Sequence, residues 1–125
     1  MSILEEQLKR LQEHFPEATL QALPGSQFLV VVPDFKIPAG WSKSPITIKF
    51  LVPTGYPMAK PDCFWTDHDL RLLRGDLPRS SGQNPIPHVG GAHLWFSWHL
   101  EAWNPNADSL LTYVHVIRKR FAEVI

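Results

Sequence analysis

Apolar residues recur at helical spacing near both ends of the chain. Between residues 4 and 15, leucine or phenylalanine returns every three or four positions, which predicts an amphipathic helix that ends near His14. Ser2 offers a cap for the first turn of this helix. The same spacing returns late in the chain and predicts a second helix over residues 109–124, with Asp108 as its cap.

Four segments between these helices carry the β-branched and aromatic residues typical of strands. They are residues 18–23, 26–32, 46–52 and 62–66. Residues 67–105 show no sustained period, apart from a short helix-like run, so we expect a long irregular segment there. The pattern therefore predicts an α+β fold with an N-terminal helix, a four-stranded antiparallel meander sheet, a long irregular segment and a C-terminal helix.

Length and charge narrow the classes of protein. A chain of 125 residues predicts a single domain over residues 1–125. Twelve basic and twelve acidic side chains cancel, so we expect neither a nucleic acid nor a membrane surface as a partner. No apolar run approaches the roughly 20 residues that span a bilayer. One cysteine and no basic, apolar leader predict a cytoplasmic protein.

Residues 94–105 hold three of the five tryptophans, together with a serine and a histidine that could do chemistry. If this segment is extended, Ser97 and His99 point to the same side, because residues two apart share a face of a strand. Ser97 would then be a nucleophile with His99 as its base, and Glu101 would be the nearest group to orient the imidazole. Alternatively, Ser97 and His99 hydrogen-bond the loop backbone and hold its shape. The sequence leaves both roles open.

Metal and cofactor sites are not expected. Structural zinc sites in long loops usually bring several cysteines, and this chain has only Cys63, which we expect to be a small buried residue of the fourth strand. No phosphate-cradling glycine loop is present. Several side chains could in principle bind zinc, but scattered histidines are the favoured interpretation. These candidates are His88, His93, His99, His68 and Asp67.

Two motifs stand in a characteristic order. Gly55-Tyr56-Pro57-Met58-Ala59-Lys60-Pro61 follows the third predicted strand, and Trp103-Asn104-Pro105 comes just before the last helix. This order resembles the ubiquitin-conjugating enzyme superfamily, whose Tyr-Pro motif leads into the fourth strand and whose Trp-x-Pro motif precedes the second helix. Ser97-Trp98-His99 ahead of Trp103 is similar, more narrowly, to a prokaryotic branch, family E, found beside ubiquitin-like proteins and activating enzymes.

The resemblance places a catalytic cysteine about eight residues before Trp103, where this chain has Trp95. An indole cannot accept an acyl group as a thiolate does. The resemblance therefore implies an atypical or non-catalytic carrier or adaptor of a bacterial ubiquitin-like conjugation pathway. The alternatives are an oxyester-forming transferase that uses Ser97 with His99, or a pure protein-interaction module of the same fold. A small hydrolase lacks the glycines of a nucleophile elbow.

The same resemblance implies two partners, a ubiquitin-activating-enzyme-like protein and a ubiquitin-like protein. Lys9 and Arg10 on the first helix would face the activating enzyme. The loops that contain Tyr56-Pro57 and Asn104-Pro105 would meet a ligase or a substrate. Three tryptophans complete the expected binding residues, namely Trp95, Trp98 and Trp103.

Overall fold

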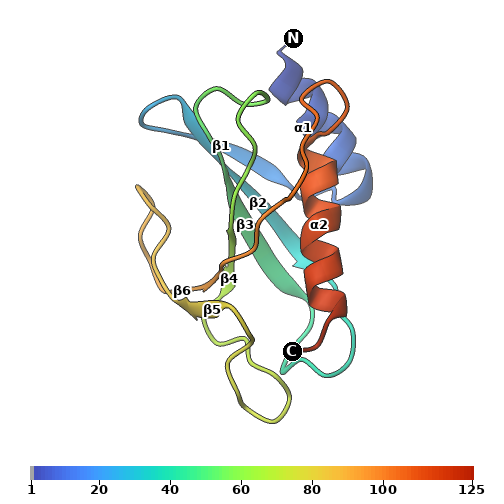
Figure 1. The fold of residues 1–125 in the computed structure, drawn as a ribbon, viewed down its shortest axis with the longest axis vertical. Helices are drawn as coiled ribbons and strands as arrows, with labels where there is room; N and C mark the ends of the chain where they lie inside the picture. Colours follow the sequence, from blue (N-terminus) through green and yellow to red (C-terminus); the bar gives the residue numbers. More distant parts are fainter. Residues whose placement is uncertain (1) are drawn as a thin grey trace.

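A computed structural model describes residues 2–125 as two helices on one side of a six-stranded antiparallel sheet (Figure 1). The helices are α1 (Ile3–His14) and α2 (Leu110–Ala122). The strands are β1 (Thr19–Leu23), β2 (Gln27–Phe35), β3 (Ile46–Val52), β4 (Phe64–Asp67), β5 (Ser81–Gln83) and β6 (His93–Phe96). They lie in the order β1-β2-β3-β4-β6-β5. The predicted α+β class, with a helix at each end, is confirmed.

The sheet has two more strands than the sequence predicted. Both lie within residues 67–105, which were expected to be irregular. β5 is three residues long and contains Gly82, whereas β6 is four residues long, so neither is long enough to show a period. Because β6 pairs with both β4 and β5, it brings the tryptophan-rich segment into the sheet. The helix-like run within 69–73 is not helical.

The helix boundaries follow the predicted pattern, with one change of cap. The Ser2 hydroxyl accepts a hydrogen bond from the Glu5 amide at the start of α1, as expected. At α2 the cap is Ser109, which forms a capping box with Thr112. Asp108 instead accepts a hydrogen bond from the Asn104 amide at 2.7 Å, so it holds the preceding turn.

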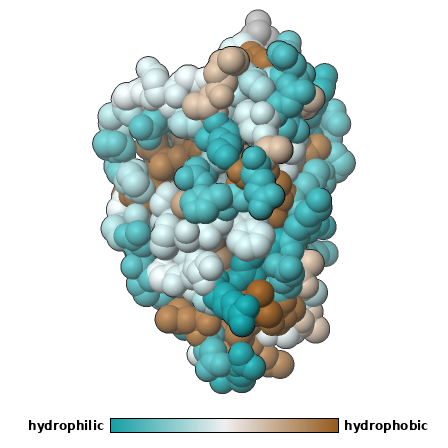
Figure 2. Space-filling model, in the orientation of Figure 1, coloured by the Kyte–Doolittle hydropathy of each residue, from teal (hydrophilic) through white to brown (hydrophobic). Residues whose placement is uncertain are grey.

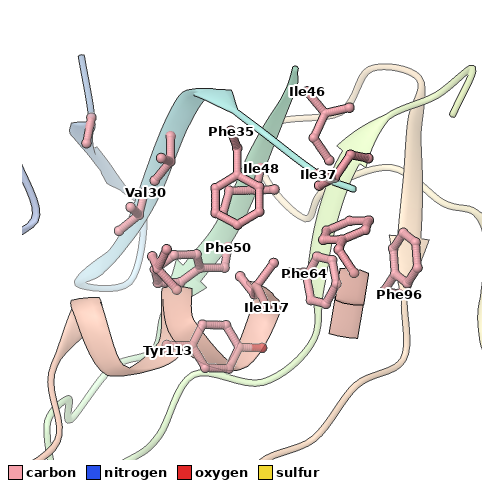
Figure 3. Packing of buried hydrophobic residues seen from close by; sticks show 14 of the residues in the cluster. Val30, Phe35, Ile37, Ile46, Ile48, Phe50, Phe64, Phe96, Tyr113 and Ile117 are labelled. Carbon is pink, nitrogen blue, oxygen red and sulfur yellow. The ribbon is translucent and has the colours of Figure 1, made fainter. Parts of the chain in front are cut away.

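The main core fills the space between the helices and the inner face of the sheet. In Figure 3, Tyr113 and Ile117 of α2 lie near Phe50 and Phe64 of two strands, and Phe96 of a third strand lies on the far side of Phe64. The rings of Phe64 and Phe96 stack at 4.8 Å, and that of Tyr113 meets Phe50 edge-on at 4.9 Å. The end of β6 is therefore anchored to a rigid core.

A smaller apolar cluster lies on the other face of the sheet, because neighbouring strand residues point to opposite faces. Its buried members are Leu29, Trp65 and Ile86. The surface in Figure 2 is largely hydrophilic, with apolar residues gathered toward the end where the C-terminus lies in Figure 1. Within residues 2–125, neither helix has the length and apolar composition to cross a bilayer.

Candidate functional site

Ser97 directly follows the last residue of β6. Its amide donates a hydrogen bond to the carbonyl of Ser80 at 2.8 Å, which continues the ladder between β5 and β6 by one step. The serine is half-buried. Backbone pairing thus fixes the position of this hydroxyl at the end of the sheet.

The Ser97 hydroxyl faces His99, which in turn contacts Asp62, and we call these three residues the Ser97–His99–Asp62 series. Ser97 Oγ lies 3.3 Å from His99 Nε2, and His99 Nδ1 contacts Asp62 Oδ1. An imidazole held by a carboxylate on one nitrogen and facing a hydroxyl with the other is the arrangement of serine nucleophile, general base and orienting acid. The two-residue spacing of Ser97 and His99 therefore does bring their side chains together.

The third group is Asp62, and the expectation that Glu101 would orient His99 was wrong. Residues at the start of β4 face residues at the end of β6, since Phe64 pairs with Phe96. That register, continued by two residues, puts Asp62 beside the Ser97–His99 segment. The signal lies in strand pairing rather than in local spacing, and β6 itself was not predicted.

The site is open to solvent. The His99 and Asp62 side chains are 58% and 55% exposed. A shallow pocket of about 480 Å³ lies beside them, lined by Ser80, Ser97, Trp98, His99 and Glu101. Glu101 thus borders the pocket without joining the series. The Ser97 and His99 side chains thus line the same open pocket.

Cys63 lies beside the same imidazole. Its Sγ, an Asp62 carboxylate oxygen and a His99 ring nitrogen all lie within 4.8 Å of one another. The residue is half-buried and stands just before β4, with φ of 61°, so the expected buried strand position was wrong. Burial raises the pKa of the Cys63 thiol, and the Asp62 carboxylate raises it further. The protonated thiol is therefore favoured.

Comparison with family models decides the family. The model of prokaryotic E2 family E matches residues 6–124 of the chain. The chain belongs to this family. No curated protein and no solved structure shows significant similarity to the chain. Family membership indicates a component of a ubiquitin-like conjugation pathway, and the resemblance stated from the two motifs is confirmed.

Trp95 occupies the position at which the resemblance to ubiquitin-conjugating enzymes expects the catalytic cysteine. It lies in β6 opposite Trp65 of β4 and packs against the smaller apolar cluster. Trp98 packs against the main core from the other side of the strand. Both indoles thus support the segment that carries Ser97, and neither supplies a nucleophile.

The two family motifs meet in space. Trp103 Nε1 donates a hydrogen bond to the carbonyl of Pro57 at 2.8 Å, and the rings of Trp103 and Tyr56 lie 5.9 Å apart. The Tyr56 hydroxyl donates to Gln7 Oε1 at 2.6 Å, which ties the motif to α1. In addition, Lys60 donates to the carbonyl of Leu100, next to His99. The loop that contains Tyr56-Pro57 therefore contacts the segment that carries His99.

Asn104 and Pro105 lie in the turn before α2, and Arg10 of α1 faces that turn. Asn104 accepts hydrogen bonds from the Asn106, Ala107 and Asp108 amides, which closes the turn before α2. Pro105 and Arg10 line a groove of about 220 Å³ between that turn and α1. Lys9 is exposed on α1 but does not line this groove. The structure thus brings Tyr56, Pro57 and Trp103 together and places Arg10 beside Pro105, whereas Lys9 and Trp95 lie apart from both groups.

The histidines considered for zinc binding do not converge within residues 2–125. The cluster of potential metal donors there contains His99 with Asp62 and Cys63. His93 instead pairs with Lys49, whose Nζ lies 3.1 Å from His93 Nε2. The zinc site considered from the spacing of His88, His93 and His99 is therefore absent from this part of the chain.

Proposed function

We propose that this chain is an atypical carrier of a ubiquitin-like conjugation pathway, which receives the C-terminus of a ubiquitin-like protein on Ser97 as an oxyester. The observation that carries the proposal is the series Ser97–His99–Asp62. A base held by a carboxylate and facing a hydroxyl is what a serine needs to act as a nucleophile near neutral pH. Membership of prokaryotic E2 family E supports a role in a ubiquitin-like conjugation pathway.

The transfer begins when Ser97 Oγ attacks the thioester carbonyl carbon presented by an activating-enzyme-like protein. The serine proton passes to His99 Nε2, which lies 3.3 Å away. The carbon–sulfur bond breaks, and the departing thiolate takes the proton back from the imidazole. Asp62 holds Nδ1–H throughout and stabilises the transient imidazolium. The products are an oxyester on Ser97 and a free thiol on the activating enzyme.

Ser97 suits this role better than Cys63. The thiol is half-buried, and burial raises its pKa, so it is a poor source of thiolate. Ser97 directly faces the imidazole nitrogen that accepts its proton. The pocket of about 480 Å³ beside it offers a groove for the extended C-terminal tail of the ubiquitin-like protein.

The partner surfaces follow from the same proposal. Lys9 and Arg10 are exposed on α1 and would meet the activating-enzyme-like protein. Tyr56, Pro57 and Trp103 form one packed unit and would meet a ligase or a substrate.

The test uses the full chain with an activating-enzyme-like protein, a ubiquitin-like protein and ATP. The expected product is an adduct that hydroxide cleaves and excess thiol does not. Ser97→Ala abolishes it, whereas Cys63→Ala and the matched control Ser26→Ala, an exposed serine in the turn between β1 and β2, retain it. An adduct that survives in Ser97→Ala, or one that thiol cleaves, overturns the oxyester.

A non-catalytic adaptor is the second candidate, and the exposure of the series favours it. His99 and Asp62 are more than half exposed, so water competes for every hydrogen bond of the site. An adaptor would use its docking loops to position the ubiquitin-like protein on another enzyme. In that case no adduct forms, Ser97→Ala leaves pathway output unchanged, and Trp103→Ala lowers it.

A further inference from the structure

Three different metal-binding side chains converge beside Ser97. Asp62 and Cys63 are adjacent in the chain, and His99 reaches them from the segment after β6. Their ligand atoms lie within 4.8 Å of one another. Such a set supplies an oxygen, a sulfur and a nitrogen ligand. Within residues 2–125, none of these three side chains forms a salt bridge with a lysine or an arginine.

We propose that Asp62, Cys63 and His99 form a binding site for a borderline-soft divalent cation of the Zn²⁺ class. Zn²⁺ accepts thiolate, imidazole and carboxylate together, and three protein ligands leave a fourth tetrahedral position for water. Cys63 binds as the thiolate, so its proton is released to solvent on metal binding. The exposure of Asp62 and His99 gives the ion direct access from solvent.

A bound cation is incompatible with the role of His99 as a base. A neutral imidazole has one ring nitrogen with a free lone pair and one that carries a proton. If Nδ1, the nitrogen beside Asp62, gives its lone pair to the metal, the proton resides on Nε2. Nε2 then faces Ser97 as a donor and no longer accepts the serine proton. Metal binding therefore switches acyl acceptance off.

This regulatory consequence rests on the proposed function, whereas the metal site itself does not. The same three residues have two mutually exclusive states, one with a carboxylate-bound imidazole and one with a cation between them. In the metal-free state Asp62 orients His99, and in the bound state both become ligands. The switch needs no change of fold, because all three side chains already lie together.

Cobalt binding tests the site without any pathway component. The full chain, without a polyhistidine tag, is titrated with Co²⁺, and a thiolate-to-cobalt absorption band is expected at one ion per chain, with Zn²⁺ displacing it. Cys63→Ala loses the band, and His99→Ala weakens affinity at least tenfold. His93→Ala, a histidine remote from the cluster and paired with Lys49, is the matched control and leaves the band unchanged.

Absence of the thiolate band in the unaltered chain, or its persistence with full affinity in His99→Ala, overturns the site. The regulatory step is then measured as Ser97 adduct formation with and without Zn²⁺. Zn²⁺ slows the reaction at least tenfold in the unaltered chain and not in Cys63→Ala, and EDTA restores it. Adduct formation with EDTA judges the proposed function separately, so failure of one inference is distinguishable from failure of the other.

Discussion

The Nδ1 atom of His99 contacts Oδ1 of Asp62, a residue 37 positions earlier in the chain. Antiparallel pairing of β4 with β6 makes this contact, because it sets the residues before one strand beside those after the other. The carboxylate selects the tautomer in which His99 Nε2 is free to accept a proton. The nucleophilic role that we propose for Ser97 thus depends on a residue outside its own segment.

Asp62→Asn is expected to slow acylation of Ser97 by about 100-fold or more, because an amide can donate to Nδ1 and trap the wrong tautomer. The rate can be measured without any partner, by mass spectrometry of the chain after exposure to p-nitrophenyl acetate. Glu101→Gln is the matched control and should change the rate less than twofold, since Glu101 only borders the pocket. Equal rates for Asp62→Asn and the unaltered chain would remove Asp62 from the mechanism.

His93→Gln is expected to flatten the loss of stability in acid. Burial lowers the pKa of His93, and the charge of Lys49 lowers it further. The unfolded chain therefore binds this proton more readily than the folded one, so the free energy of unfolding falls as pH drops below about 6.5. Urea unfolding between pH 7 and 5 measures the slope. His115→Gln, an exposed position on α2, should keep the slope of the unaltered chain.

Gln7→Ala should lower the free energy of unfolding by about 2–3 kcal/mol, because it leaves two donors without their acceptor. Gln7 is 9% exposed, and its Oε1 accepts from the Tyr56 hydroxyl at 2.6 Å and the Leu110 amide at 3.1 Å. Denaturant unfolding gives the value. Glu13→Ala, exposed on the same helix, should stay within about 0.5 kcal/mol. A comparable loss of stability in both variants would mean that the two hydrogen bonds accepted by Gln7 Oε1 do not stabilise the fold beyond an ordinary surface contact.

Arg120→Met should destabilise the fold by about 3 kcal/mol and loosen the support of Ser97. The buried guanidinium donates hydrogen bonds to the carbonyls of Glu123, Ile125 and Arg79. The next carbonyl along the chain, that of Ser80, accepts a hydrogen bond from the Ser97 amide. The substitution should therefore accelerate hydrogen exchange more at the Ser97 amide than at the Val30 amide in the core. Lys119→Met, exposed on the same helix, is the control. An unchanged exchange rate at the Ser97 amide in Arg120→Met would show that Arg120 does not support the position of Ser97.

The helices and the first three strands could be predicted from the sequence because each is long enough to show its period, and β4, with only four residues, was predicted from its aromatic composition. β5 and β6 were missed, since both are short and their pairing is long-range. The cap of α2 was misassigned by one residue because Asp108 and Ser109 are both good caps. Only the observed hydrogen bonds show that Asp108 serves the Asn104 turn instead.

For the candidate site too, the local contact could be predicted from the sequence and the long-range contacts could not. The two-residue spacing indicated that Ser97 and His99 would meet, and their side-chain atoms lie 3.3 Å apart. Asp62 and Cys63 could not be added, because their position depends on the β4–β6 register. Cys63 was assigned to a strand interior, whereas the chain turns with positive φ at that residue before β4 begins.

The serine that receives the acyl group in our proposal is supported by the outermost strand of the sheet. β5 has only three residues and a single neighbour, and the Ser80 carbonyl next to it holds the Ser97 amide. Edge strands of this kind open in local fluctuations that cost less than global unfolding. Warming should consequently disable the carrier while its core is still folded, so the temperature at which function is lost would lie below the melting temperature of the domain.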